Sequence, residues 1–291
     1  MTTRPAPVVT GYDGSPAGLA ALDWATTEAV RLHAPLRIAE VFQLVIATRP
    51  SLGKTVPLAT LRALRERGLN AIAEGIRLRH PTLQVEAVLL DGVAAKQLVE
   101  EAAAARLMVL GSRGLGGWTG LMLGSVAMQV TMHAPCPVIV VPPDQRPRVA
   151  DQPTVVVGVD GSQTSARAIG FAFEHADALG ARVVAVHAWT SPYLTYVDGE
   201  SMLQFDDEDV KESSRLLVAE SVAGAVLDYP DVPWQTRLIN GQAARAILRA
   251  GDSADLIVVG SRGRGGFAGL LVGSVSQHVL HHAPCPVAVI R

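Results

Sequence analysis

The stretch RLMVLGSRGLGGWTGLMLGSV, residues 106–126, joins an apolar run to a glycine-rich loop and then to the start of a predicted helix. Its first seven residues have the continuous apolar character of a strand that is buried on both faces. The stretch holds six glycines, three of which set the spacing Gly111-x2-Gly114-x9-Gly124, with Ser125 next. Such a loop suits a hinge, close packing, or backbone N–H groups that approach a phosphate.

The same stretch occurs twice in the chain. Residues 111–141 align without gaps to residues 260–290, and nineteen of the thirty-one positions are identical. Near the N-terminus, VVTGYDGSPAGLAALDWA corresponds to VVVGVDGSQTSARAIGFA at an offset of 147 residues. A period of this length indicates a duplicated domain rather than a solenoid. We predict domain 1 at 1–143, a linker rich in proline and charge at 144–153, and domain 2 at 154–291.

Strand-like and helix-like patterns alternate along the first half. The predicted strands are 7–12, 36–42, 83–90, 106–112 and 137–141, and the predicted helices are 16–33, 58–79, 93–105 and 125–133. The apolar face expected for the first helix consists of Leu19, Leu22, Ala25, Ala29 and Leu32. This alternation predicts an α/β fold made of two Rossmann-like or flavodoxin-like domains, each with a five-stranded parallel sheet covered by helices on both faces.

In such sheets, ligands bind beyond the carboxyl ends of the strands, where the strand order reverses. The first and fourth strands are expected to flank this crevice. They end in Asp13-Gly14-Ser15 and in the glycine stretch, so the pattern places these two loops side by side.

The glycine stretch differs from the common nucleotide-binding motifs. It contains no GxxxxGK[ST], and no GxGxxG follows the first strand. Gly111 and Gly114 could still expose backbone N–H groups to an anion, and Gly124-Ser125 begins a helix whose dipole attracts negative charge. A tight connection that serves packing alone remains the alternative. Asp13 and Asp160 have two interpretations as well: helix caps, or groups that contact a ribose, a purine or a divalent ion.

Composition narrows the class of protein. The net charge is −2 and no basic block occurs, so neither a nucleic acid nor a membrane is an expected partner. No signal peptide or membrane-spanning run is evident, and we expect a soluble cytoplasmic protein. The two cysteines, Cys136 and Cys285, occupy the same hexapeptide HAPCPV and are expected to be small buried residues.

These motifs together resemble the universal stress protein family, once in each half of the chain. The resemblance implies sheets of order 3-2-1-4-5 and the ATP-binding type of the family, with Mg²⁺ or Mn²⁺ accompanying the nucleotide. The implied ligand-binding residues of the first half are Asp13, Val41, Gly111, Arg113, Gly114, Gly124, Ser125 and Val126. Those of the second half are Asp160, Ala188, Gly260, Arg262, Gly263, Gly273, Ser274 and Val275. Glu40 departs from the pattern, because the second half has His187 at that place, as do many relatives.

Three functions fit this resemblance. The first is an ATP-binding regulator of stress response, growth arrest or dormancy. The second is a slow ATPase or nucleotide-hydrolysing enzyme of the adenine-α-hydrolase type, although His133 and His282 suit the C-terminus of a helix better than a catalytic base. The third is a nucleotide-free interaction module.

We also expect self-association. The last strand of each half should lie at a sheet edge, where it requires a partner. The two halves are therefore predicted to pair through these strands, and the intact chain to form a homodimer. A regulatory protein partner is expected but is not identified by the sequence. The acidic, aromatic-bearing segment 190–209 is either a partner surface or a solvated loop.

Overall fold

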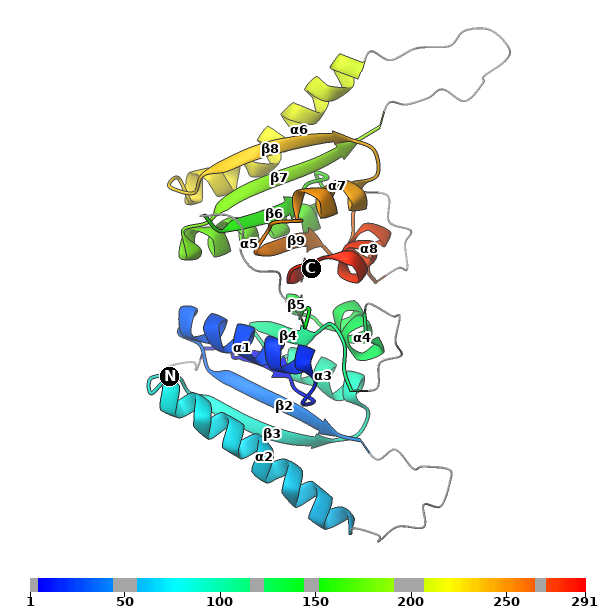
Figure 1. Cartoon of the computed structure of the whole chain (residues 1–291). Coiled ribbons are helices and arrows are strands. Elements are labelled where there is room, and N and C mark those ends of the chain that lie inside the picture. Colours follow the sequence, from blue (N-terminus) through cyan, green and yellow to red (C-terminus); the bar gives the residue numbers. More distant parts are fainter. Residues whose placement is uncertain (1–4, 44–56, 116–122, 144–151, 191–206, 265–270) are drawn as a thin grey trace, which may run out of the picture. The chain divides into compact units, whose positions relative to one another are not determined.

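The computed structural model describes residues 5–43, 57–115, 123–143, 152–190, 207–264 and 271–291. It divides into two compact units, Met1–Asp144 and Gln145–Arg291 (Figure 1). Segments 43–57 and 190–209, the spacer glycines Gly116, Gly117 and Gly120, and the linker 144–153 lie wholly or mostly outside the described residues.

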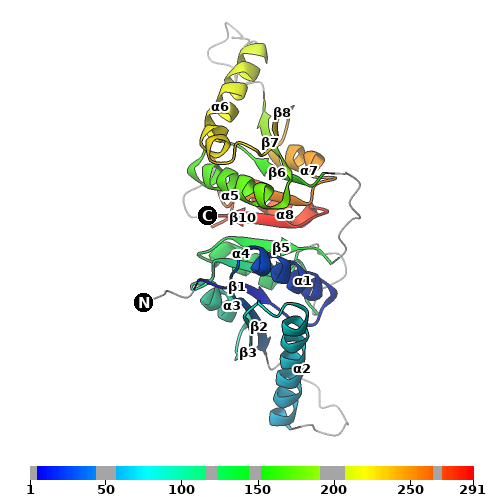
Figure 2. The same cartoon turned by 90° about the vertical axis from the view of Figure 1, so that its left-hand side faces the viewer.

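The first unit alternates strands and helices as the sequence predicts. Its strands are β1 (Val8–Gly11), β2 (Leu36–Phe42), β3 (Val85–Asp91), β4 (Leu107–Gly111) and β5 (Val138–Val141). Its helices are α1 (Pro16–Arg31), α2 (Leu58–Arg79), α3 (Ala94–Ala102) and α4 (Ser125–His133). In Figure 2, α1 and α2 cover one face of the sheet and α3 and α4 the other.

The sheet of this unit is parallel, with the order β3-β2-β1-β4-β5. The strand order reverses beside β1, which pairs with β2 on one side and with β4 on the other. Gly11, the last residue of β1, is in register with Ala39 and with Leu110. The turn after β1 and the loop after β4 therefore leave the sheet at the same level, as the sequence predicts.

Apolar strand residues form the core. Val8, Val9, Ile38, Met108, Val109 and Ile139 are completely buried. Leu19 was expected on the buried face of α1 but is 48% exposed; alanines and Leu22 form that face instead. Small residues are required there because α1 approaches the end of β4 so closely that a Cβ on Gly111 would lie 2.6 Å from the carbonyl carbon of Ala17.

The second unit repeats this architecture. Its strands are β6 (Thr154–Gly158), β7 (Arg182–Trp189), β8 (Trp234–Asn240), β9 (Leu256–Gly260) and β10 (Val287–Ile290), in the order β8-β7-β6-β9-β10. Its helices are α5 (Gln163–Leu179), α6 (Asp207–Asp228), α7 (Ala243–Ala250) and α8 (Ser274–His282). The predicted fold class and strand order are confirmed in both units.

Candidate functional site

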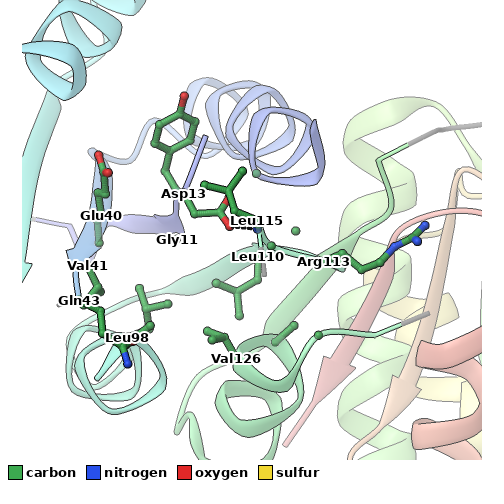
Figure 3. Close-up of a pocket in the computed structure, with 18 of the residues that line it drawn as sticks. Gly11, Asp13, Glu40, Val41, Gln43, Leu98, Leu110, Arg113, Leu115 and Val126 are labelled. Carbon is green, nitrogen blue, oxygen red and sulfur yellow. Dashed lines mark hydrogen bonds between the residues drawn. The ribbon is translucent and has the colours of Figure 1, made fainter. Parts of the chain in front are cut away.

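A cavity of about 520 Å³ opens beyond the carboxyl ends of the strands in the first unit. Figure 3 shows Val41, Leu98, Leu110 and Val126 gathered on one side of the Asp13 carboxylate. All eight residues that the sequence singles out in this half line the cavity: Asp13, Val41, Gly111, Arg113, Gly114, Gly124, Ser125 and Val126. The cavity is large enough for a small-molecule ligand, and most of its wall is apolar with a few polar groups.

The second unit has a corresponding cavity of about 540 Å³. It is likewise lined by all eight predicted residues of its half: Asp160, Ala188, Gly260, Arg262, Gly263, Gly273, Ser274 and Val275. The duplication therefore reproduces the cavity as well as the fold in each unit.

Asp13 connects the two loops that meet at the cavity. Its Oδ1 accepts a hydrogen bond from the backbone N–H of Ser15 at 3.0 Å, and its Oδ2 accepts one from the N–H of Leu115 at 3.1 Å. Asp160 makes the same pair of bonds to Ser162 and Arg264, at 2.9 and 3.1 Å. The helix-cap interpretation of the aspartates is wrong, because Ser15 and Ser162 are the N-caps of α1 and α5.

Close packing requires glycine at the first two glycine positions of each motif. A Cβ on Gly111 would meet the backbone of Ala17, and a Cβ on Gly114 would lie 2.5 Å from Asp13 Oδ2. In the second unit, a Cβ on Gly263 would lie 2.4 Å from Asp160 Oδ2, and one on Gly260 would lie 2.9 Å from Thr164 Oγ1. These glycines allow the loop after the fourth strand to approach the turn after the first.

Packing against the described residues does not require glycine at the third position of each motif. Gly124 and Gly273 are the N-caps of α4 and α8, with φ of −74° and −72°, which other residues adopt readily. The nearest described atoms to a Cβ at these positions would be 3.4 Å and 3.6 Å away, which is ordinary contact. Both glycines line the cavities. A bare backbone at these positions therefore leaves space on the cavity side.

Within the described ranges, the first backbone N–H groups of α4 and α8 have no side-chain acceptor. The first N–H groups of a helix have no intrahelical acceptor. Among the described residues, no side chain caps either helix, in contrast to Ser15 on α1 and Ser162 on α5. Ser125 and Val126, and their counterparts Ser274 and Val275, thus present backbone donors and the positive end of a helix dipole to the cavity.

Arg113 lines the cavity mainly through its backbone. Its carbonyl oxygen accepts a hydrogen bond from Ser15 Oγ at 3.2 Å. Its guanidinium group points away from Asp13 and Val126 (Figure 3). The carbonyl of Arg262 is held in the same way by the hydroxyl of Thr164.

The end of β2 distinguishes the two cavities. Glu40 is only 7% exposed and accepts a hydrogen bond from Arg65 Nη1 on α2 at 2.9 Å. Burial raises the pKa of the Glu40 carboxyl, and the attraction of Arg65 opposes this rise. Burial, then the charges of Glu40 and Asp13, raise the pKa of the neighbouring Tyr12. In the second unit, a ring nitrogen of His187, Nδ1, lies 2.8 Å from the carbonyl oxygen of Val159.

Several lining residues were missed by sequence reasoning. In the first cavity they include Tyr12, Phe42, Gln43, Arg65, Leu98 and Leu115. In the second they include Ser165, Ile247, Arg264 and Ser276. Leu98 lies within the predicted helix 93–105, where the sequence does not distinguish it from a core residue, and Ile247 lies on α7 of the second unit. Leu115 and Arg264 immediately follow the second glycine of each motif, so their position next to the motif could have identified them as lining residues.

Within the described ranges, no group of three or more His, Cys, Asp or Glu side chains could hold a metal ion. None of the helices in those ranges combines the length and hydropathy of a membrane-spanning segment. Both cysteines are buried, as expected.

Comparison with known proteins identifies the family. The model of the universal stress protein family matches residues 6–142 and again residues 153–291. The universal stress protein Rv2005c of Mycobacterium tuberculosis is 35% identical over 292 residues, covering 98% of this chain and 96% of that protein. Rv2623 of the same organism is 34% identical over 291 residues, with coverage of 98% and 96%.

A solved structure has the same fold over the whole chain. The crystal structure of a universal stress protein from Archaeoglobus fulgidus has a TM-score of 0.67 and 20% identity, covering 98% of this chain and 96% of that one. The two matches to the family model account for both units, and the chain belongs to the universal stress protein family, with two copies of its domain in tandem.

Proposed function

We propose that this chain is an ATP-binding regulatory protein with one nucleotide site in each unit. The observation that carries the proposal is the bare backbone at Gly124 and Gly273. Neither position requires glycine for its backbone conformation or for contact with any described atom, yet both face a cavity at an uncapped helix N-terminus. This arrangement suits a phosphate group, which needs backbone donors and close approach.

The rest of each cavity suits a nucleoside. Val41, Leu98, Leu110 and Val126 offer an apolar surface to a base in the first unit. The Asp13 carboxylate is fixed by two backbone N–H groups, and its remaining lone pairs can accept a hydrogen bond from a ribose hydroxyl. The chain's own groups would thus hold the phosphates at one end of the ligand and the nucleoside at the other.

A divalent ion would be bound mainly by the phosphates. In the described part of the chain, each cavity supplies no cluster of metal-binding side chains. Mg²⁺ commonly binds proteins in this way, through substrate phosphates, waters and one or two carboxylates. Mn²⁺ accepts a similar set of oxygen ligands.

Regulation fits the site better than hydrolysis. His133 and His282 lie at the C-termini of α4 and α8, and their Nδ1 atoms are 2.8 Å from the carbonyl oxygens of Gln129 and His278. At a rise of about 1.5 Å per residue, these rings are on the order of 12 Å from the helix ends that line the cavities. They are therefore too distant to act as bases at a phosphate there. We infer that nucleotide occupancy, rather than turnover, is the output in stress response, growth arrest or dormancy.

Nucleotide content tests the proposal. Denaturing the purified chain should release ATP, and titration of the emptied chain with ATP and Mg²⁺ should show two sites. The variants Gly124→Val and Gly273→Val should each lose one site and together lose both, because a branched side chain would fill the space at the helix N-terminus. Gly75→Ala on α2, where no described atom lies within 4 Å, is the matched control and should keep both sites. Full nucleotide content in the double variant would contradict the proposal.

Self-association stays a prediction. Pairing of the two units through β5 and β10, and homodimer formation by the intact chain, follow from the edge-strand argument of the sequence. Light scattering on the full chain tests the second statement, and a strict monomer would contradict it.

A further inference from the structure

Leu115 and Arg264 occupy one of the structurally equivalent positions at which the two cavities differ. The backbone N–H of Leu115 donates to Asp13 Oδ2, and that of Arg264 donates to Asp160 Oδ2, both at 3.1 Å. The shared hydrogen bond shows that these residues occupy the same place in the two units. One carries an apolar side chain and the other a permanent positive charge.

The guanidinium group of Arg264 lies beside the turn that follows β6. Gly161 in this turn has a φ of +74°, and a Cβ there would lie 3.1 Å from Arg264 Nη2 and 3.4 Å from Leu217 Cδ1. Arg264 lines the second cavity and is exposed. Within the described ranges, no carboxylate forms an ion pair with it. Its charge is therefore available to an anion in the cavity.

The charge balance of the two cavities differs as a result. Arg113 and Arg262 are equivalent and do not distinguish the two cavities. Apart from them, the first cavity has two carboxylates and one guanidinium group: Asp13, Glu40 and Arg65. The second has one carboxylate and one guanidinium group, Asp160 and Arg264, so its lining is more positive by one charge. The counterpart of Glu40 in the second cavity is His187, a side chain that carries no negative charge.

We propose that the second cavity is the polyphosphate-selective site of the pair and that Arg264 is the residue that makes it so. This inference rests on the proposed function, because it specifies which nucleotides each site prefers. The attraction of a fixed cation for a ligand increases with the ligand's negative charge, so it favours ATP over AMP. For one charge at a partly solvated cavity edge, we expect about a five- to tenfold effect on this preference, decreasing as salt is added.

The experiment measures each site by itself in the full-length chain. Gly124→Val leaves the second site and Gly273→Val leaves the first. For each background, calorimetric titration with ATP and with AMP gives a ratio of dissociation constants at low and at high salt. The second site should show the larger preference for ATP and the steeper salt dependence.

Reciprocal exchange of the two side chains then assigns the cause. In the Gly124→Val background, Arg264→Leu should lower the ATP preference about five- to tenfold, whereas Arg264→Lys should keep most of it. In the Gly273→Val background, Leu115→Arg should raise the preference by a similar factor. Both positions are exposed, so the exchanges should leave the folded state intact, which circular dichroism checks.

The outcomes separate this inference from the proposed function. Equal ATP preferences in the two backgrounds, or preferences that the exchanges leave unchanged, would overturn the role of Arg264 and leave nucleotide binding in place. If the wild-type chain binds neither nucleotide, both the proposed function and this inference are overturned.

Discussion

Ser15 Oγ donates a hydrogen bond to the carbonyl oxygen of Arg113, 98 residues away in sequence, at 3.2 Å. The hydroxyl oxygen of Ser15 also accepts a hydrogen bond from the N–H of Gly18 at 3.0 Å and thereby caps α1. One buried hydroxyl thus stabilises a helix and holds the glycine loop. The second unit divides these tasks: Ser162 caps α5 through the N–H of Ser165, and Thr164 binds the carbonyl of Arg262.

Removing the Ser15 hydroxyl should affect stability and ligand binding together. We expect Ser15→Ala to lower the free energy of unfolding by about 1–2 kcal/mol and to weaken nucleotide affinity at the first site. Ser162→Ala should mainly lower stability, and Thr164→Val should mainly weaken affinity at the second site. Urea unfolding and calorimetric titration measure the two quantities. An unchanged affinity in Ser15→Ala would contradict the role of this hydroxyl in holding the loop.

The glycines of the motif should separate into two groups. Gly111→Ala should lower the free energy of unfolding by about 2 kcal/mol, because its Cβ would press on the backbone of α1. Gly124→Ala should lower it by less, about 0.5–1 kcal/mol, because its Cβ would make ordinary contacts and only the poorer N-cap preference of alanine acts there. Urea unfolding of both variants checks this contrast. Equal losses would show that Gly124 also serves packing.

Glu40 should make stability depend on pH. A carboxyl whose pKa is raised in the folded state binds a proton more tightly there than in the unfolded chain. Its contribution to stability is therefore present below the unfolded pKa and is lost as the pH rises through the folded pKa. Relative to wild type, Glu40→Gln should become progressively more stable as the pH rises from about 4 to about 8, and Arg65→Met progressively less stable. A pH-independent difference in urea unfolding would refute this prediction.

Glycines inside the helices offer a test of the backbone geometry. Gly75 in α2 and Gly224 in α6 have no described atom within 4 Å of the position that an added Cβ would take. Replacing either by alanine should raise the free energy of unfolding by about 0.5–1 kcal/mol. Gly180, the C-cap of α5, also has open space but a φ of +59°, so Gly180→Ala should lower stability instead. Thermal unfolding of the three variants should show these opposite signs.

The sequence predicts the fold well because the parallel strands are buried on both faces and read as continuous apolar runs. The predicted ranges 36–42 and 58–79 coincide with β2 and α2. The burial of Leu19 was predicted wrongly, because apolar spacing does not show which face of α1 turns toward the sheet; the buried face runs through Gly18, Ala21 and Ala25. The close contact of that face with the end of β4 depends on Gly111, a residue from a different element.

Sequence reasoning predicts the lining of the site more completely than its internal contacts. The strand ends and the glycine spacing identify the lining residues, because topology brings them together. The hydrogen bond that the N–H of Leu115 donates to Asp13 depends on how the loop after β4 lies against the turn after β1. The ion pair between Glu40 and Arg65 depends on how α2 packs against the sheet. Neither periodicity nor residue type encodes that placement. The sequence also does not predict that the Arg113 guanidinium points outward, because this direction depends on the placement of the loop.

The close approach of Gly114 to Asp13 has an evolutionary consequence. Any side chain at position 114 would compete for the space of the Asp13 carboxylate, since its first carbon would lie 2.5 Å from Oδ2. The two positions are thus coupled: a domain copy that loses this glycine also loses the reason to keep the aspartate. If one of the two sites loses its function after gene duplication, substitutions should occur together at these two codons. The apolar residues of the underlying strands should remain apolar.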